Sequence, residues 1–322
     1  MQQDSRSSVP LPSTGATRFL DACHLRQPDA TPIWFMRQAG RSLSQHRDLR
    51  RQYDVLTIMR TPELCAAATL LPVESFGVDG AVLYADIMQP TEGMGIKLEI
   101  QDTGPVIHNP VRTAKDVDAL RVVDAEESVP YTLDAVRIVH RELQGKQVVI
   151  GMCGAPFTLA CYMIEGRPSR DYALAKAFMY SQPVLWHALL EKLTQVLISY
   201  LQAQIRAGAD VVQLFDSWAG TLSPSIYRQY VLPYTQRIFA AIKQLGAPSI
   251  HFGVGTASLL EVMAEAGGDV LSVDWRVDLD QAWERIGYER GIQGNLDPTL
   301  LLTSWPLVEA AMHDILRRAA GR

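Results

Sequence analysis

Short apolar runs alternate with longer amphipathic segments along most of the chain. Seven runs rich in Val, Ile and Phe predict strands, and a polar loop and a segment of helical period follow almost every one. The predicted strands cover 32–35, 81–85, 147–151, 210–215, 249–252, 269–273 and 291–294. The main predicted helices cover 17–25, 61–76, 130–143, 182–207, 224–245, 257–266 and 304–319. The runs at 95–100 and 105–111 predict a hairpin inserted after the second strand.

This order of elements predicts an α/β fold. Continuous apolar strands that alternate with helices indicate a parallel sheet with both faces covered. About seven such units, without a Gly-rich phosphate-binding fingerprint, favour a TIM-type (β/α)8 barrel over a doubly wound sheet. Residues 1–16, which are rich in Ser, Pro and Thr, are expected to form a flexible arm, and residues 17–322 a single barrel domain.

Composition and charge exclude several classes of protein. The 322 residues are 48% hydrophobic and 20% charged, which is typical of a packed globular chain and not of a disordered one. A net charge of -5 gives no general attraction for nucleic acid or an anionic membrane. The four cysteines are widely spaced without a CxxC pair, which predicts reduced thiols and no structural metal. No apolar run reaches membrane-spanning length, so a soluble cytoplasmic protein is expected.

Polar residues follow the predicted strands. Active sites of (β/α) barrels are built at the carboxyl ends of the strands, so these side chains are expected to lie around one mouth. They are Arg37, Asp86, Cys153, Gly154, Asp216, Ser217, His251, Asp274, Asn295 and Asp297.

An arginine cluster follows the first predicted strand of this acidic protein. Arg37 and Arg41 are four positions apart with Gly40 between them, so on a helical turn both guanidinium groups point the same way. Arginine binds carboxylates with two parallel hydrogen bonds, which predicts a polycarboxylate ligand. Arg47 and Arg51 are better explained as a solvated face with ion pairs.

Asp86 follows the second predicted strand and has apolar neighbours on both sides. A buried carboxylate requires donors or a cationic partner. It is either a structural acid paired with one of the arginines, or an acceptor for N–H groups that stabilises positive charge on a ligand.

Taken together, these segments resemble the uroporphyrinogen decarboxylase family of haem biosynthesis. PIWFMRQAGR matches the most characteristic motif of the family, and GAPFTLACYMIEG, VVQLFDSWAG and GNLDP match further blocks in the same order. The similarity runs from about residue 18 to residue 300. It implies a (β/α) barrel, usually a homodimer, that needs neither metal nor organic cofactor. Such a carboxy-lyase converts uroporphyrinogen III into coproporphyrinogen III by removing four acetate carboxyl groups as CO2.

The resemblance also implies roles for individual residues. Asp86 matches the acid that accepts the pyrrole N–H groups, and Asp86, Arg37 and Tyr162 are the expected catalytic residues. The expected substrate-binding residues are Arg37, Gln38, Ala39, Gly40, Arg41, Arg50, Asp86, Tyr162 and Ser217.

The chain departs from the family pattern in two places. It reads GRSLSQHR where the family has GRYLPEYR, and it ends at Arg322 before a further strand and an Asn-Leu-Gly-His-Gly loop. We therefore expect a barrel without its last β/α unit, an open strand edge, and weakened or absent activity.

Two alternatives remain at this point. The first is an inactive homologue that binds porphyrinogen without releasing CO2. The second is a cobamide- or zinc-dependent methyltransferase of the same fold, which requires His and Cys ligands on late strands; no Cys follows His251.

Overall fold

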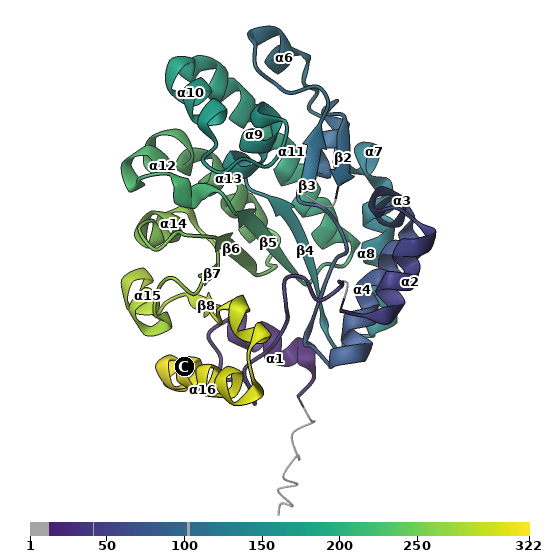
Figure 1. Cartoon of the computed structure of the whole chain (residues 1–322), viewed down its shortest axis with the longest axis vertical. Helices are drawn as coiled ribbons and strands as arrows, with labels where there is room; N and C mark the ends of the chain where they lie inside the picture. The colour runs from purple at the N-terminus through teal and green to yellow at the C-terminus, as the bar shows by residue number, and fades with distance from the viewer. Residues whose placement is uncertain (1–12, 41, 102–103) are drawn as a thin grey trace, which may run out of the picture.

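The computed structural model describes residues 13–40, 42–101 and 104–322. Its centre is a curled parallel sheet of six strands in the order β1-β4-β5-β6-β7-β8, and helices cover its outer face (Figure 1). The strands are β1 (Gly80–Val82), β4 (Val148–Gly154), β5 (Val211–Asp216), β6 (Ser249–Gly253), β7 (Val270–Ser272) and β8 (Gly291–Gln293). The predicted hairpin is confirmed as the antiparallel pair β2 (Leu98–Gln101) and β3 (Gly104–Ile107).

The helices surround this sheet in chain order. The first eight are α1 (Gly15–Cys23), α2 (Ser44–Gln52), α3 (Val55–Arg60), α4 (Pro62–Phe76), α5 (Pro90–Gly93), α6 (Ala114–Ala119), α7 (Ala125–Ser128) and α8 (Pro130–Leu143). The next eight are α9 (Pro156–Glu165), α10 (Ala173–Ser181), α11 (Pro183–Ala207), α12 (Pro224–Tyr230), α13 (Leu232–Lys243), α14 (Leu260–Ala266), α15 (Leu279–Ile286) and α16 (Trp305–Ala319). Two 3-10 turns, η1 (Ala219–Thr221) and η2 (Pro298–Leu302), follow β5 and β8.

Alternation along the strands divides the core into two layers. On β5, Val211 and Phe215 belong to a cluster inside the curl, whereas Val212 and Leu214 pack against the helices outside it. Phe19 and Cys23 of α1 join the inner cluster, and α1 lies beneath the sheet in Figure 1. Helix α1 thus closes one end of the curl. The arm predicted over residues 1–16 falls mostly outside the described residues, and α1 begins within it at Gly15.

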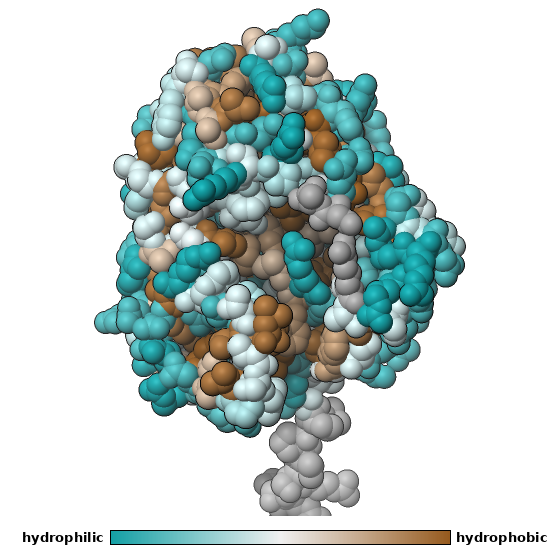
Figure 2. Space-filling model, in the orientation of Figure 1, coloured by the Kyte–Doolittle hydropathy of each residue, from teal (hydrophilic) through white to brown (hydrophobic). Residues whose placement is uncertain are grey.

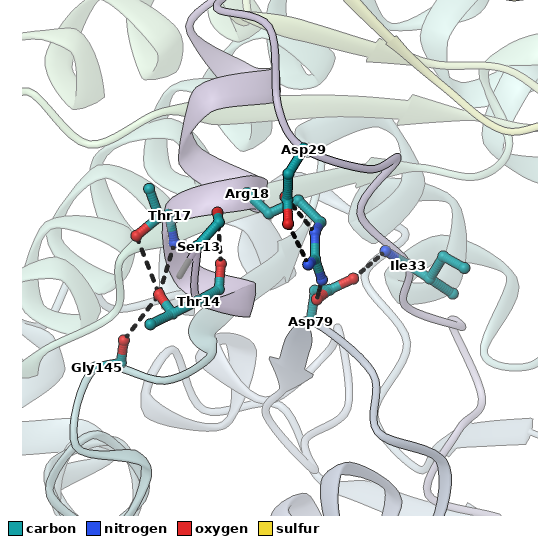
Figure 3. Close-up of polar contacts among 8 residues, drawn as sticks. All are labelled: Ser13, Thr14, Thr17, Arg18, Asp29, Ile33, Asp79 and Gly145. Carbon is teal, nitrogen blue, oxygen red and sulfur yellow. Dashed lines mark hydrogen bonds and ion pairs between the residues drawn. The ribbon is translucent and has the colours of Figure 1, made fainter. Parts of the chain in front are cut away.

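The prediction of a strand at 32–35 is wrong. This segment is extended, but among the described residues its backbone bonds towards the sheet only through Ile33, whose carbonyl accepts the N–H of Asp79, the residue before β1, at 2.8 Å. The Asp79 carboxylate accepts the Ile33 N–H and also binds Arg18, which in turn pairs with Asp29 (Figure 3). Side chains rather than a strand ladder therefore attach this segment beside β1.

Other boundaries also differ from the prediction. Strand β4 extends to Gly154, so Cys153 lies within the strand and not in the loop after it. The helix predicted over 224–245 is two helices, because the chain leaves helical geometry at Val231, just before the Leu232-Pro233 start of α13. The helices predicted at 61–76, 130–143 and 182–207 are confirmed.

Within the described residues, β1 and β8 are the edges of the parallel sheet. The expected open edge at the last strand is therefore confirmed for this part of the chain. On the face that Figure 2 shows, hydrophobic side chains gather over η2 and the start of α16, where Leu301, Leu302 and Trp305 are exposed. The same face is hollowed near its centre.

Candidate active site

The loop of residues 36–40 carries the exposed side chain of Arg37. Its neighbour Gln38 is buried, with 3% of its surface exposed, and donates to the Gly80 carbonyl at 2.9 Å while accepting the Phe35 N–H at 3.0 Å. Gln38 thus attaches the Arg37 loop to β1. Its amide is already committed to the backbone, so it is not available as a direct ligand in this conformation. Arg41, the second predicted arginine, lies outside the described residues.

Asp86 lies in the loop after β1. One carboxylate oxygen accepts the Met88 N–H at 2.8 Å, and the backbone carbonyl of Asp86 accepts the Gln89 N–H at 3.1 Å. Burial raises the pKa of Asp86 above its usual range, and the negative charge of Glu92 raises it further. The hydrogen bond from the Met88 N–H and the positive charge of Arg37 both act to lower this pKa. Arg37 is therefore close enough to Asp86 for its charge to act on this carboxyl group.

Tyr162 projects from α9 and has only 7% of its surface exposed. Burial, and then the nearby charge of Asp86, raise the pKa of Tyr162 to about 12. The phenol therefore keeps its proton across the neutral range and serves as a hydrogen-bond donor. Its ring contacts Trp218 edge to face, with 5.8 Å between the ring centroids. Arg37, Asp86 and Tyr162 belong to three separate segments and influence one another electrostatically.

Ser217 follows β5 and is partly buried, whereas the neighbouring Asp216 is buried and has different partners. Asp216 is fully buried and accepts hydrogen bonds from Thr158 of α9 and Tyr227 of α12, both at 3.1 Å. His251, in the middle of β6, is also fully buried and faces Met263 of α14. The expectation that Asp216 and His251 reach the mouth is wrong, because both face the helix layer.

Two further arginines of the predicted cluster, Arg50 and Arg51, lie on α2 and bind other partners. Arg50 donates to the Tyr53 carbonyl at 2.9 Å, and its charge opposes the burial that raises the pKa of Tyr84, near the end of β1. The predicted surface pair is confirmed, since Arg51 binds Asp48 at 2.6 Å with both side chains exposed.

Sequence reasoning missed Trp218, Thr158 and Glu92. The alternation of side chains along β5 was an available signal for the orientation of Asp216. Val212, Leu214 and Asp216 occupy alternate positions on this strand, so all three face the helices. Thr158 and Tyr162 are four residues apart on α9 and share one helix face.

No metal or membrane feature stands out in the part of the chain that the structure describes. It contains no group of three or more His, Cys, Asp and Glu side chains placed to hold a metal ion. Its four cysteines are free thiols and all are buried. None of its helices is both long and apolar enough to cross a bilayer.

Comparison with known proteins identifies relatives over nearly the full chain. The family model described as "Uroporphyrinogen decarboxylase (URO-D)" matches residues 14–322. The uroporphyrinogen decarboxylase of Carboxydothermus hydrogenoformans is 49% identical over 305 residues, which are 94% of this chain and 87% of that protein. The enzyme of the same name from Chloroflexus aggregans is 51% identical over 310 residues, covering 95% of this chain and 87% of the relative. That from Salinispora tropica is 49% identical over 320 residues, covering 99% and 85%.

A solved structure supports the fold. A methyltransferase from Methanosarcina mazei superposes with a TM-score of 0.80 and covers 95% of this chain and 90% of its own. Its sequence identity is 22%, so the likeness concerns the fold alone.

Proposed function

Because the chain belongs to the uroporphyrinogen decarboxylase family of haem biosynthesis, we propose that it removes the four acetate carboxyl groups of uroporphyrinogen III as CO2. The product is coproporphyrinogen III. The observation that carries the proposal is the 49–51% identity to relatives named uroporphyrinogen decarboxylase over at least 94% of this chain, and the electrostatic influence that Arg37, Asp86 and Tyr162 have on one another supports it.

Asp86 is the central residue of the proposed mechanism. Loss of CO2 from an acetate leaves an electron pair that needs an acceptor. A pyrrole ring protonated beforehand accepts those electrons itself, so the substrate does the work that an electron-sink cofactor performs in other decarboxylases. The Asp86 carboxylate accepts the pyrrole N–H groups and stabilises the cationic ring more than the neutral one, which lowers the barrier.

The arginines bind the carboxylates of the substrate. Arg37 is exposed on the loop that Gln38 attaches to β1, and we assign to it the bidentate binding of acetate or propionate groups. Arg41 and the backbone of Ala39 and Gly40 complete this proposed floor, with Arg50 as a further cation at its edge. Gln38 contributes by holding the loop, since its side chain is bonded to the backbone at both ends.

Tyr162 and Ser217 orient the reacting acetate in this proposal. With its pKa raised to about 12, the hydroxyl group of Tyr162 is protonated at neutral pH and donates a hydrogen bond to a substrate carboxylate. Ser217 offers a second hydroxyl group from the loop after β5.

The family also supports a broader architecture. We infer that the curled six-stranded sheet belongs to a (β/α)8 barrel whose active site lies at the carboxyl ends of the strands. A homodimer, and a cytoplasmic location suited to four free thiols, are further parts of the proposal.

The test is a turnover assay. Purified protein is incubated without oxygen with uroporphyrinogen III, and the products are separated by the number of carboxyl groups that they retain. We expect the wild type to form coproporphyrinogen III and Asp86→Asn to lose about 100-fold or more in kcat. Asp134→Asn, which changes an exposed carboxylate on α8, is the matched control and should retain full activity.

Two outcomes contradict the proposal. Tight binding of uroporphyrinogen by the wild type without CO2 release identifies the inactive binding homologue. Equal turnover by the wild type and Asp86→Asn removes Asp86 from the mechanism while leaving the activity in place.

A further inference from the structure

A buried hydrogen-bond chain lies directly behind the candidate site. The hydroxyl group of Thr158 donates to one carboxylate oxygen of Asp216 at 3.1 Å and accepts the backbone N–H of Trp218 at 3.2 Å. The hydroxyl group of Tyr227 donates to the other carboxylate oxygen at 3.1 Å. Thr158, Asp216 and Tyr227 all have 0% of their surface exposed, so water does not compete for these bonds.

This chain fixes the residues on either side of Ser217. Asp216 is bonded through its side chain and Trp218 through its backbone N–H, while the Trp218 carbonyl accepts the Thr221 hydroxyl at 2.8 Å and the Thr221 N–H at 3.1 Å. The turn that carries Ser217 is therefore held at both ends.

The same turn sets the position of Tyr162. The ring of Trp218 contacts both Tyr162, with 5.8 Å between the ring centroids, and Tyr172, with 4.8 Å. Tyr172 has 1% of its surface exposed, so the tryptophan ring packs against a buried side chain. A shift of the Trp218 backbone would be transmitted to the Tyr162 ring by direct contact.

We propose that Thr158 and Asp216 are positioning residues for decarboxylation, which hold Ser217 and, through Trp218, the phenol of Tyr162 in register with Asp86. The expected effect on turnover rests on the proposed function. The expected effect on the position of Trp218 does not depend on it. Misplacement of a reacting partner by about 1 Å reduces rates by about 100-fold. Loss of the Thr158 hydroxyl group is therefore expected to lower kcat about tenfold or more and to change KM less.

The first experiment compares three threonine variants in the turnover assay. Thr158→Val removes the hydroxyl group at nearly constant volume, and Thr158→Ser keeps it. Thr194→Val is the matched control, because Thr194 is equally buried and its hydroxyl group bonds only to the Leu190 carbonyl within α11. We expect a loss of kcat in Thr158→Val, recovery to within about twofold of wild type in Thr158→Ser, and wild-type turnover in Thr194→Val. An unchanged kcat in Thr158→Val overturns the inference.

A double-mutant cycle then tests the route through Tyr162. If Thr158 acts by placing the Tyr162 hydroxyl group, Thr158→Val has little further effect once Tyr162→Phe has removed that group. The same loss of kcat in both backgrounds shows independent effects and overturns the route. If Thr158→Val fails to fold, Tyr227→Phe removes one donor to Asp216 and takes its place in the cycle.

A spectroscopic readout separates this inference from the proposed function. The chain has six tryptophans, and 5-fluorotryptophan labelling gives each a 19F resonance, with Trp218 assigned by Trp218→Phe. We expect Thr158→Val to shift or broaden the Trp218 resonance and Thr194→Val to leave it in place. Wild-type protein that releases no CO2 refutes the proposed function while the Trp218 result still stands. An unmoved Trp218 resonance refutes the positioning network, whatever the activity.

Discussion

The indole N–H of Trp34 donates to the side-chain carbonyl of Gln293 at 2.8 Å, which joins the segment before Arg37 to strand β8. Gln293 belongs to the edge strand β8, whereas Trp34 belongs to the segment attached beside the other edge strand, β1, and 259 positions separate them in the chain. The Gln293 amide also donates to Ser272 of β7 at 2.9 Å and to Gln213 of β5 at 3.2 Å. One side chain thus connects β5, β7, β8 and the Arg37 segment inside the curl.

The first prediction concerns this connection. Gln293→Leu removes all three hydrogen bonds and leaves the partly buried Trp34 N–H without its acceptor, which costs about 1–3 kcal/mol in the free energy of unfolding. Urea denaturation monitored by circular dichroism measures this change. Gln281→Leu, an exposed glutamine on α15, is the control and should change the free energy of unfolding by less than about 0.5 kcal/mol. Equal stability of the two variants would show that the connection contributes nothing to the fold.

Hydrophobic periodicity predicted most of the helices and six of the parallel strands because the buried residues of those elements form a regular pattern in the local sequence. The segment at 32–35 has the same apolar character, yet it forms no strand. Its state depends on partners distant in the chain: Asp79, which is itself paired with Arg18, binds Ile33, and Gln293 binds Trp34. Local pattern carries no information about those side-chain bonds, so the strand was predicted where only an extended segment exists.

The candidate site shows a similar division. The position of Asp86 after an apolar run was sufficient to predict that it lies just beyond the end of a strand, whereas Arg37 follows a run that is extended but forms no strand. The orientation of Asp216 was missed because its place directly after an apolar run suggested the mouth, whereas the alternation of β5 turns it towards Thr158 and Tyr227. Glu92 was missed because its influence on Asp86 depends on how α5 turns back beside the loop.

A second prediction concerns the effect of Glu92 on the pKa of Asp86. The charge of Glu92 raises the pKa of Asp86, and Arg37 is the charge that opposes it. Because the mechanism requires the Asp86 carboxylate, activity is lost as pH falls through this raised pKa. Glu92→Gln removes the neighbouring negative charge, so it lowers the pKa of Asp86 and moves the acid limb of the kcat/KM profile to lower pH.

The Glu92 experiment has a nearby control. Glu92 also binds Arg60 of α3, so its loss leaves an additional positive charge near the loop, which acts in the same direction. Glu127→Gln changes an exposed carboxylate on α7 and should leave the acid limb where it is in the wild type. A move of the acid limb to higher pH in Glu92→Gln would contradict the assignment of that limb to Asp86.

A third prediction separates charge from geometry at Arg37. Lysine keeps the positive charge but cannot make two parallel hydrogen bonds to one carboxylate. If Arg37 binds substrate carboxylates in that way, Arg37→Lys raises KM about tenfold or more, as expected for a lost bond to a charged group. Arg51→Lys is the matched control, because Arg51 forms only an exposed pair with Asp48, and its KM should equal that of the wild type. A wild-type KM in Arg37→Lys would show that charge alone is sufficient at this position.

The last prediction concerns acid stability at the attachment of the Arg37 segment. Two hydrogen bonds from Arg18 hold the pKa of Asp29 at about 2, below the value near 3.9 that an unfolded aspartate has. A carboxyl group whose pKa is lower in the folded state stabilises the protein above about pH 4, and this stabilisation is lost as pH falls towards 2. Asp29→Asn should therefore lower the free energy of unfolding at pH 7 and flatten its decline between about pH 4 and pH 2. Urea titrations at several pH values measure the slope, with Asp118→Asn on α6 as an exposed control. A slope in Asp29→Asn as steep as that of the wild type would show that the pair with Arg18 does not contribute to the acid unfolding of this protein.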